Sequence, residues 1–233
     1  MNFLLTVVLV IIIIYVLIWM FSKSKTLSNY QSSNKQLDIA VDKLTKPESV
    51  KYGYSFWLYI KTWESTINEK CIFYRSNGSG TTTKYFPKVT LGSSTNTLTV
   101  TIDDLTASST SALTCTMSNC PIQTWISITI SLNNRTLDMY MNGKLVKTCI
   151  SSFLPSVDST AGLVVCPEDS TIFDPWDGKI ARFEYYSDMI SSQEAWNIYK
   201  KGPGGSLLGS FLNEYKIKLS FLKGGDEKAN ITI

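Results

Sequence analysis

The sequence contains no histidine, and this absence limits the chemistry that its side chains can perform. Serine and cysteine nucleophiles of the Ser-His-Asp and Cys-His types need an imidazole as general base, so both schemes are excluded. Hydrolysis of a glycosidic bond needs two carboxyl groups about 5 Å apart. A Glu-x-Asp-x-Glu run, which would supply such a pair from one strand, does not occur in the chain. We therefore expect a protein that is not an enzyme.

Cysteines are the other reactive side chains, and there are five of them: Cys71, Cys115, Cys120, Cys149 and Cys166. An odd number cannot pair completely within one chain. The spacing of Cys115 and Cys120 leaves two alternatives open, a small disulfide loop or half of a metal site. Zinc is disfavoured because the sequence has no histidine and no second close cysteine pair. The remaining cysteines lie in apolar, strand-like segments and are expected to be small core residues.

Charge gives no reason to expect a nucleic-acid partner. The net charge is +3, and Lys and Arg do not cluster. Three sequons for N-linked glycosylation begin at Asn77, Asn134 and Asn230. Such tripeptides often arise by chance and matter only if the chain enters a lumen.

The elements that position these residues begin with an apolar segment from Phe3 to Phe21. It has nineteen residues without a charge, Gly or Pro. As a helix it would span roughly 28 Å, close to the hydrocarbon thickness of a bilayer. The β-branched run around Ile11 suits lipid, and Tyr15 and Trp19 are amphipathic side chains that suit an interface. No Ala-x-Ala-like site follows, so we predict an uncleaved transmembrane anchor rather than a signal peptide.

The residues behind this anchor (residues 1–22) predict its orientation. Lys23, Lys25 and Lys35 follow it with no acid before Asp38, whereas only the α-amino group is charged on the other side. The positive-inside rule then places the rest of the chain in the cytosol, where thiols stay reduced. A type II signal anchor with a lumenal domain is the alternative.

Beyond the anchor the pattern is typical of an all-β domain. Aromatic residues make up 12% of the chain, Ser and Thr are abundant, and Gly, Asn and Asp punctuate it. Residues 23–50 are polar and are predicted to be a tether, within which Gln36–Leu44 could form a short helix or strand. We predict the segment Asp103–Pro121 to be irregular. Alternating apolar residues predict strands at Tyr54–Ile60, Cys71–Tyr74, Pro87–Gly92, Thr97–Ile102, Trp125–Leu132, Thr136–Met141, Lys144–Cys149, Gly162–Cys166 and Gly178–Tyr186.

Two local motifs strengthen this prediction. Asn142-Gly143 is the strongest dipeptide signal for a type I′ turn, so the segments on either side of it should form a hairpin. Ser191 and Glu194 have the spacing of a capping box, which predicts a short helix that ends before Gly202.

Together these segments resemble the laminin-G-like, concanavalin A-like jelly roll. The resemblance rests on the strands YSFWL, WISITI and GKIARFEYY, on the hairpin NRTLDMYMNGK and on the helix SSQEAWNIY. It covers residues 51–205 and implies an antiparallel β-sandwich with alternating buried faces. The residues expected to define the fold are Trp57, Trp125, Asn142, Gly143 and Gly178. Among these, the tryptophans are expected at the core or rim, with a sugar-stacking platform as the alternative.

The resemblance also suggests a metal site to consider. Members of this fold often hold calcium at the rim of the sandwich, and Asp169, Asp174 and Asp177 lie in a suitable loop. Loop carboxylates that only stabilise turns are the favoured alternative, so we expect no cofactor.

The arrangement of a single N-terminal span before this domain looks like membrane-anchored jelly-roll proteins of large icosahedral DNA viruses. The resemblance implies a non-enzymatic minor capsid protein, an adaptor between an internal membrane and other shell proteins. It would reside in the inner membrane of the virion, or in a membrane derived from the endoplasmic reticulum with the domain cytosolic. The alternative is a membrane-anchored lectin-like attachment protein that binds a glycan. Free thiols would favour the adaptor, and paired cysteines with glycosylated sequons the lectin.

The remaining residues, 206–233, lie outside the usual limit of the family. Tyr215–Phe221 alternates and predicts an added strand. This strand is expected to close the sandwich, and the alternative is an exposed edge that docks another chain.

Overall fold

The computed structural model describes residues 26–77, 83–106, 110–168, 171–204, 218–223 and 226–232. The predicted membrane anchor, with Phe3, Ile11, Tyr15, Trp19 and Phe21, lies outside these residues. Within the described part of the chain, no helix combines the length and the apolar character that crossing a bilayer requires.

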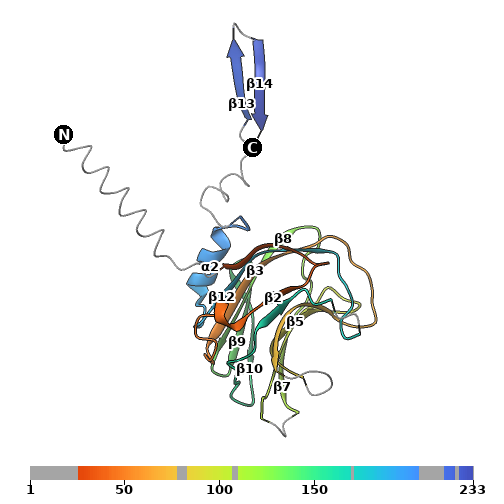
Figure 1. The fold of residues 1–233 in the computed structure, drawn as a ribbon, viewed down its shortest axis with the longest axis vertical. Helices are drawn as coiled ribbons and strands as arrows, with labels where there is room; N and C mark the ends of the chain where they lie inside the picture. Colours follow the sequence, from red (N-terminus) through yellow and green to blue (C-terminus); the bar gives the residue numbers. More distant parts are fainter. Residues whose placement is uncertain are drawn as a thin grey trace, which may run out of the picture.

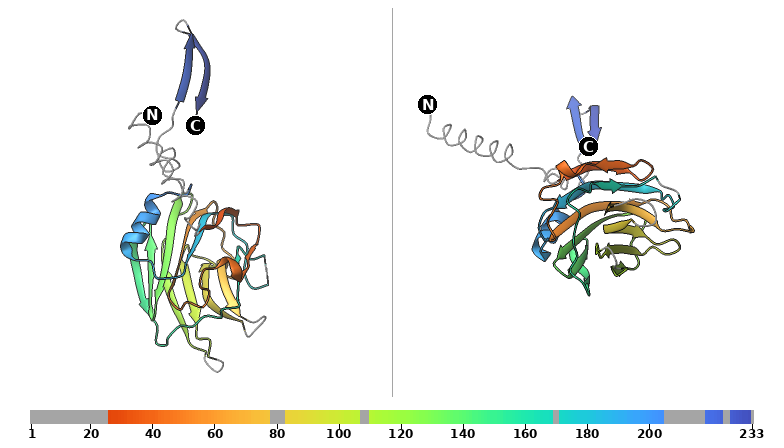
Figure 2. Two further views of the ribbon diagram at one scale, coloured as in Figure 1. Left: turned by 60° about the vertical axis from the view of Figure 1, so that its left-hand side comes forward. Right: turned by 60° about the horizontal axis from the view of Figure 1, so that its bottom comes forward.

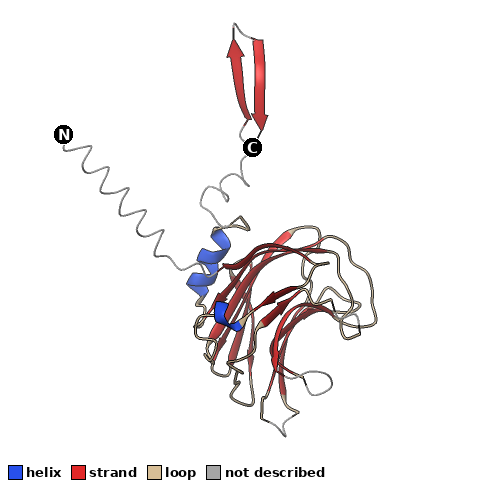
Figure 3. Cartoon of the chain, viewed as in Figure 1, coloured by secondary structure: helices blue, strands red, loops and turns tan. Residues whose placement is uncertain are grey.

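Two six-stranded antiparallel sheets form a sandwich, which confirms the predicted all-β sandwich (Figures 1 and 3). The two layers are seen separately in the left view of Figure 2. Sheet A has the order β1 (Thr26–Ser32), β12 (Gly178–Tyr186), β3 (Tyr52–Ile60), β8 (Trp125–Asn133), β9 (Thr136–Met141) and β10 (Lys144–Ile150). Sheet B has the order β2 (Leu37–Ile39), β11 (Leu163–Val165), β4 (Lys70–Asn77), β5 (Lys84–Leu91), β6 (Leu98–Asp103) and β7 (Ala112–Met117).

The core lies between the two sheets and is built from alternating side chains of each strand. In β6 the residues Leu98, Val100 and Ile102 are buried and their neighbours half-exposed, as the period of two predicts. Aromatic rings join the layers at the centre, where Phe73 of β4 contacts Phe183 of β12 with ring centroids 4.9 Å apart. Edge-to-face pairs of this kind add specific geometry to the burial of apolar area.

The predicted hairpin turn is confirmed by its backbone. Asn142 and Gly143 have φ angles of +50° and +73°, as a type I′ turn between β9 and β10 requires. The amide oxygen of Asn142 accepts a hydrogen bond from the backbone N–H of Ser127 at 2.9 Å. A Cβ added to Gly143 would lie 3.0 Å from the Cα of Trp196. Gly143 is therefore needed for its left-handed backbone and for close packing against the helix.

That helix, α2 (Ser192–Lys200), covers part of the outer face of sheet A. The capping box is present in both directions between Ser191 and Glu194, as predicted. Ala195 and Ile198 of α2 are buried in a small cluster outside the main core. Trp57 of β3 stacks on Tyr199 of α2 with ring centroids 5.7 Å apart, so Trp57 serves as the anchor point of the helix.

The prediction of a polar tether over residues 23–50 is wrong for residues 26–32, which form β1, whereas the short helix or strand considered at Gln36–Leu44 is present. β1 pairs with β12, β2 pairs with β11, and a short 3-10 helix follows at Val41–Lys43. Both strands lie at the edge of their sheets, where one side has no ladder and polar side chains are tolerated. The apolar alternation that predicted the other strands is for that reason absent from β1.

The segment Asp103–Pro121 was predicted to be irregular and contains strand β7 instead. Leu113, Cys115 and Met117 point inward and alternate with exposed neighbours. This alternation of apolar and polar residues is present in the sequence, but the many threonines and serines in the segment made it resemble a loop.

The C-terminal prediction also needs correction. Strand β13 (Lys218–Lys223) pairs with β14 (Asp226–Thr232) in a separate two-stranded sheet and does not join the sandwich. Closing a hairpin over so short a connection costs little entropy, which favours pairing with the neighbouring segment.

Candidate functional site

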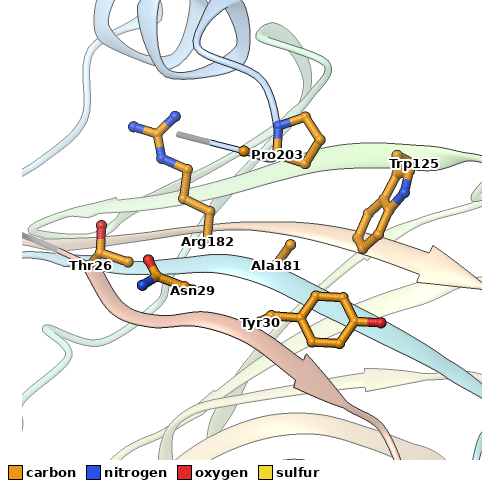
Figure 4. Close-up of a pocket in the computed structure, with 8 residues that line it drawn as sticks. Thr26, Asn29, Tyr30, Trp125, Ala181, Arg182 and Pro203 are labelled. Carbon is orange, nitrogen blue, oxygen red and sulfur yellow. The ribbon is translucent and has the colours of Figure 1, made fainter. Parts of the chain in front are cut away.

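A cleft of about 550 Å³ lies on sheet A, where β1 and β12 meet the start of β8 and the turn after α2 (Figure 4). It combines segments from the beginning, middle and end of the domain. Its described lining residues are Thr26, Asn29, Tyr30, Trp125, Ala181, Arg182, Pro203 and Gly204. The volume falls within the ~300–1,000 Å³ range that is usual for small-molecule sites.

A bulge in β12 shapes the floor of the cleft. The register of β12 with β3 shifts between Ala181 and Glu184, and Arg182 has a φ of +48°. The small side chain of Ala181 leaves the floor open, while Arg182 points toward the turn that carries Pro203 (Figure 4). Bulges of this type commonly redirect a side chain beside a functional site.

A buried ion pair holds this end of the cleft together. Nε of Arg182 donates to Oε1 of Glu184 at 2.9 Å, and both side chains are less than a tenth exposed. Arg182 also donates to the carbonyl oxygen of Gly202 at 3.3 Å. Glu184 accepts further hydrogen bonds from the hydroxyls of Thr26 and Tyr186, at 3.2 and 2.8 Å. The network therefore ties β1, β12 and the turn after α2 to one carboxylate.

This network explains why the pKa of Tyr186 is raised. Burial raises the pKa of Tyr186, and the negative charge of Glu184 raises it further. Because Tyr186 stays protonated, it remains a hydrogen-bond donor to Glu184. We conclude that these groups hold the walls of the cleft in position.

Two aromatic side chains form the other walls. Trp125 is half-buried and packs against Tyr59, with ring centroids 5.5 Å apart. Tyr30 of β1 is 56% exposed, and the ammonium of Lys179 lies 5.6 Å from its ring centroid. Interaction with Tyr30, chiefly through a hydrogen bond, raises the pKa of Lys179. Trp125 was expected at the core or rim, and the structure places it at the rim.

The cleft joins aromatic faces to hydroxyl and amide groups. Trp125 and Tyr30 supply apolar surface, and Thr26 and Asn29 supply hydrogen-bonding groups. None of the described lining residues is a carboxylic acid, so these side chains offer no acid and base pair across a scissile bond. The arrangement suits recognition of an amphipathic small molecule.

The predicted calcium ligands are already engaged by protein groups or lie elsewhere. Asp174 accepts the backbone N–H of Asn68 at 2.6 Å. Asp177 accepts the hydroxyl of Thr62 at 3.1 Å and pairs with Lys61 at 3.5 Å. Among the described residues, no group of three or more potential metal ligands lies together. Asp169 lies outside the described residues.

Asp177 instead contributes to a second, smaller cleft of about 200 Å³. Its other described lining residues include Glu64, Lys70 and Trp176. Next to it, Gly178 has no room for a Cβ, which would collide with the carbonyl oxygen of Tyr59 and the ring of Trp176. This contact explains why Gly178 begins strand β12.

The suggested pairing of Cys115 with Cys120 is wrong. Cys115 forms a disulfide with Cys149, with Cα atoms 5.9 Å apart, and Cys120 is a free, buried thiol. β7 and β10 lie at the edges of different sheets, so the bond joins the two layers. Spacing along the sequence could not reveal this partner, because the two cysteines meet only once both sheets are formed.

The comparisons with known proteins agree with this architecture. Residues 31–195 match the family model Laminin_G_3, described as the concanavalin A-like lectin/glucanases superfamily. The chain belongs to this superfamily. The match reaches from the end of β1 to within α2. It includes Trp125, Ala181 and Arg182 of the cleft, whereas the lining residues of β1 and of the turn after α2 lie outside it. No curated protein matches the sequence.

Solved structures with a similar fold include three botulinum neurotoxin domains. The serotype D ligand-binding domain in complex with N-acetylneuraminic acid shares 15% identity and a TM-score of 0.58, covering 77% of this chain and 43% of that one. The receptor-binding domain of the C/D mosaic serotype shares 15% identity and a TM-score of 0.57, covering 77% of this chain and 44% of that one. The serotype D binding domain shares 15% identity and a TM-score of 0.54, covering 73% of this chain and 41% of that one. This chain spans less than half the length of those chains, and at this identity the likeness shows the fold alone.

Proposed function

We propose that the protein is a membrane-anchored, non-enzymatic module that binds a glycan in the cleft of sheet A. The observation that carries the proposal is the placement of Trp125 and Tyr30 on either side of the small floor residue Ala181. Sugar rings present C–H groups on their faces and hydroxyls at their edges. An aromatic wall with nearby hydroxyl and amide groups offers surface of both kinds.

The side chains around the cleft are preorganised for ligand binding. The ion pair of Arg182 and Glu184 fixes the turn that carries Pro203, and packing on Tyr59 fixes Trp125. Side chains that are held in place lose little conformational entropy when a ligand binds.

The proposal of a membrane anchor rests on the apolar segment Phe3–Phe21. Only residues 22–25 separate it from β1, a chain length of at most about 18 Å. The cleft would then lie near the bilayer, within reach of glycans carried by the membrane.

Binding can be tested with the full-length protein reconstituted in lipid nanodiscs. The probes are an array of immobilised glycans, including glycolipid headgroups, with binding read by fluorescence. We expect a defined set of glycans to be retained, and Trp125→Ala and Tyr30→Ala each to reduce binding at least tenfold. Trp196→Ala is the matched control, because Trp196 is 37% exposed on α2 and does not line the cleft. Retention that is unchanged in Trp125→Ala would contradict the proposal.

A second candidate function, the adaptor between a membrane and a protein shell, is favoured by the edge strand β10. Leu145, Val146 and Ile150 are each at least half exposed, and Lys144 is exposed beside them. A strand edge with free backbone groups can add a strand from another chain. The apolar and basic character of this edge suits a partner strand with apolar and acidic residues. In this function the protein would be a minor capsid protein of a large DNA virus, with its domain on the cytosolic side.

The adaptor predicts protection of β10 in the assembled state. Hydrogen exchange of the β10 amides can be compared between the isolated protein and membrane-containing particles. Slower exchange in β10 with unchanged exchange in the opposite edge strand β1 would support docking. Equal rates in both preparations would contradict it.

A further inference from the structure

The disulfide between Cys115 and Cys149 carries information about the compartment in which the domain folds. Cys115 is fully buried on the inner face of β7, and Cys149 is half-buried on β10. A disulfide of this kind persists in oxidising compartments and is rare where glutathione keeps thiols reduced. The bond therefore favours a lumenal or extracellular domain over a cytosolic one.

The three remaining cysteines fit the same environment. Cys71, Cys120 and Cys166 are all buried. Burial raises the pKa of the Cys120 thiol to about 11 and that of Cys166 to about 12. The thiolate is the form that reacts in disulfide exchange and oxidation, and at neutral pH these thiols hold almost none of it. Each cysteine of the chain is thus either paired or shielded.

One of the sequons lies on an exposed turn. Asn134 and Arg135 form the two-residue connection between β8 and β9, and both are exposed. Asn134 has a φ of +54°, a conformation that asparagine tolerates better than most residues. Thr136, the third residue of the sequon, opens β9 opposite Asn133. A transferase can reach the amide of Asn134 without unfolding either sheet.

We propose that the domain resides on the lumenal or extracellular side of the membrane and carries an N-linked glycan on Asn134. The co-reactant is a lipid-linked oligosaccharide diphosphate presented by the host transferase. The side-chain nitrogen of Asn134 forms a bond to the anomeric carbon of this donor. The bond between that carbon and the diphosphate oxygen breaks, the diphosphate leaves with the electron pair, and the amide gives up one proton. This orientation is the opposite of the one that the positive-inside rule predicts from Lys23 and Lys25.

The position of Asn134 leaves the cleft open. Trp125 and Asn133 are the two ends of β8. Eight residue steps along a strand correspond to about 26 Å. A glycan on Asn134 would therefore project from the end of β8 opposite Trp125. The inference does not depend on what the cleft binds.

Translation of the full-length chain with endoplasmic-reticulum microsomes tests the modification. We expect one band shift that peptide N-glycosidase F removes. Thr136→Ala should abolish the shift, whereas Thr136→Ser, which keeps the sequon, should retain it. Both variants leave the backbone of Asn134 intact. Asn77→Gln is the control at another sequon and should leave the shift unchanged. A shift that survives Thr136→Ala would overturn the assignment of the site.

Counting accessible thiols tests the compartment separately. After expression in eukaryotic cells, denaturation and alkylation without reduction should label three cysteines, and reduction should raise the count to five. This result would hold even if a sequon variant folded poorly. Five labelled cysteines before reduction, together with no glycan, would overturn the lumenal location.

Discussion

The guanidinium of Arg182 and the carboxylate of Glu184 pair across the bulge of β12, at 2.9 Å and almost out of contact with water. The two residues are two positions apart and lie where the register of β12 with β3 shifts. The pair in turn fixes β1 and the turn after α2. The geometry of the cleft therefore depends on a charge pair, one member of which, Arg182, also lines the cleft.

Replacing Glu184 by Gln should destabilise the fold by about 3 kcal/mol, because it leaves the buried charge of Arg182 uncompensated. The amide keeps the shape of the side chain, so the loss reports mainly on charge. Urea unfolding measures it. The double variant Arg182→Met, Glu184→Met should lose less than Glu184→Gln alone. If the double variant were the less stable of the two, the ion pair would itself add net stability to the fold, beyond each charge compensating the other.

The sequence predicted those parts of the fold that carry their own local signal. Strict alternation in β6, the Asn142-Gly143 turn and the capping box of Ser191 all have physical causes within a few residues, and all three were confirmed. Strand β1 was not predicted, because an edge strand needs few apolar residues.

The cleft could be predicted only in part. Trp125 was recognised as a residue of the rim or core, but Tyr30 and Arg182 were not connected with it. Tyr30 lay in a supposed tether. A bulge between Ile180 and Phe183 could be expected from the sequence, but it comes to lie beside Tyr30 only when β12 is paired with β1. The Cys115–Cys149 disulfide was missed for a similar reason, since it forms between sheets. Contacts that depend on tertiary pairing leave no local pattern in the sequence.

Replacing Cys149 by Ser should lower stability substantially. The disulfide closes a segment with a sequence separation of 34 residues. In the chain-entropy model, a loop of this size contributes about 4 kcal/mol. That corresponds to a fall in Tm of about 10 °C for a domain of this size. Calorimetry with and without reductant measures it. Reductant should lower the Tm of the unaltered protein and leave that of Cys149→Ser unchanged, and equal sensitivity in both would contradict the assignment.

Replacing Gly143 by Ala should destabilise the hairpin and its contact with α2. A Cβ at a φ of +73° is disfavoured by about 1–2 kcal/mol. It would also press on Trp196 and Tyr199, each 3.0 Å away, and displace the helix. We therefore expect a loss of at least 2 kcal/mol in urea unfolding. Lys144→Ala, at the exposed neighbouring position, is the control and should change stability by less than about 0.5 kcal/mol. A similar small effect for Gly143→Ala would show that the turn tolerates a side chain.

Stability should fall as the pH rises above the ordinary thiol range. Cys166 ionises with its ordinary pKa of 9.0 when the chain unfolds, but burial raises its pKa to about 12 in the folded state. Above pH 9 the unfolded chain therefore binds fewer protons than the folded one, and the free energy of unfolding decreases with pH. The stabilising contribution of the protonated thiol is complete below pH 9 and is lost as the pH rises toward 12. Over the steep part of this range the slope for one thiol is about 1.4 kcal/mol per pH unit. Urea unfolding of Cys166→Ala at pH 8, 9.5 and 10.5 should show a shallower decline than the unaltered protein by up to this amount. Identical slopes would mean that Cys166 reaches water in the folded state, which its burial at the end of β11 argues against.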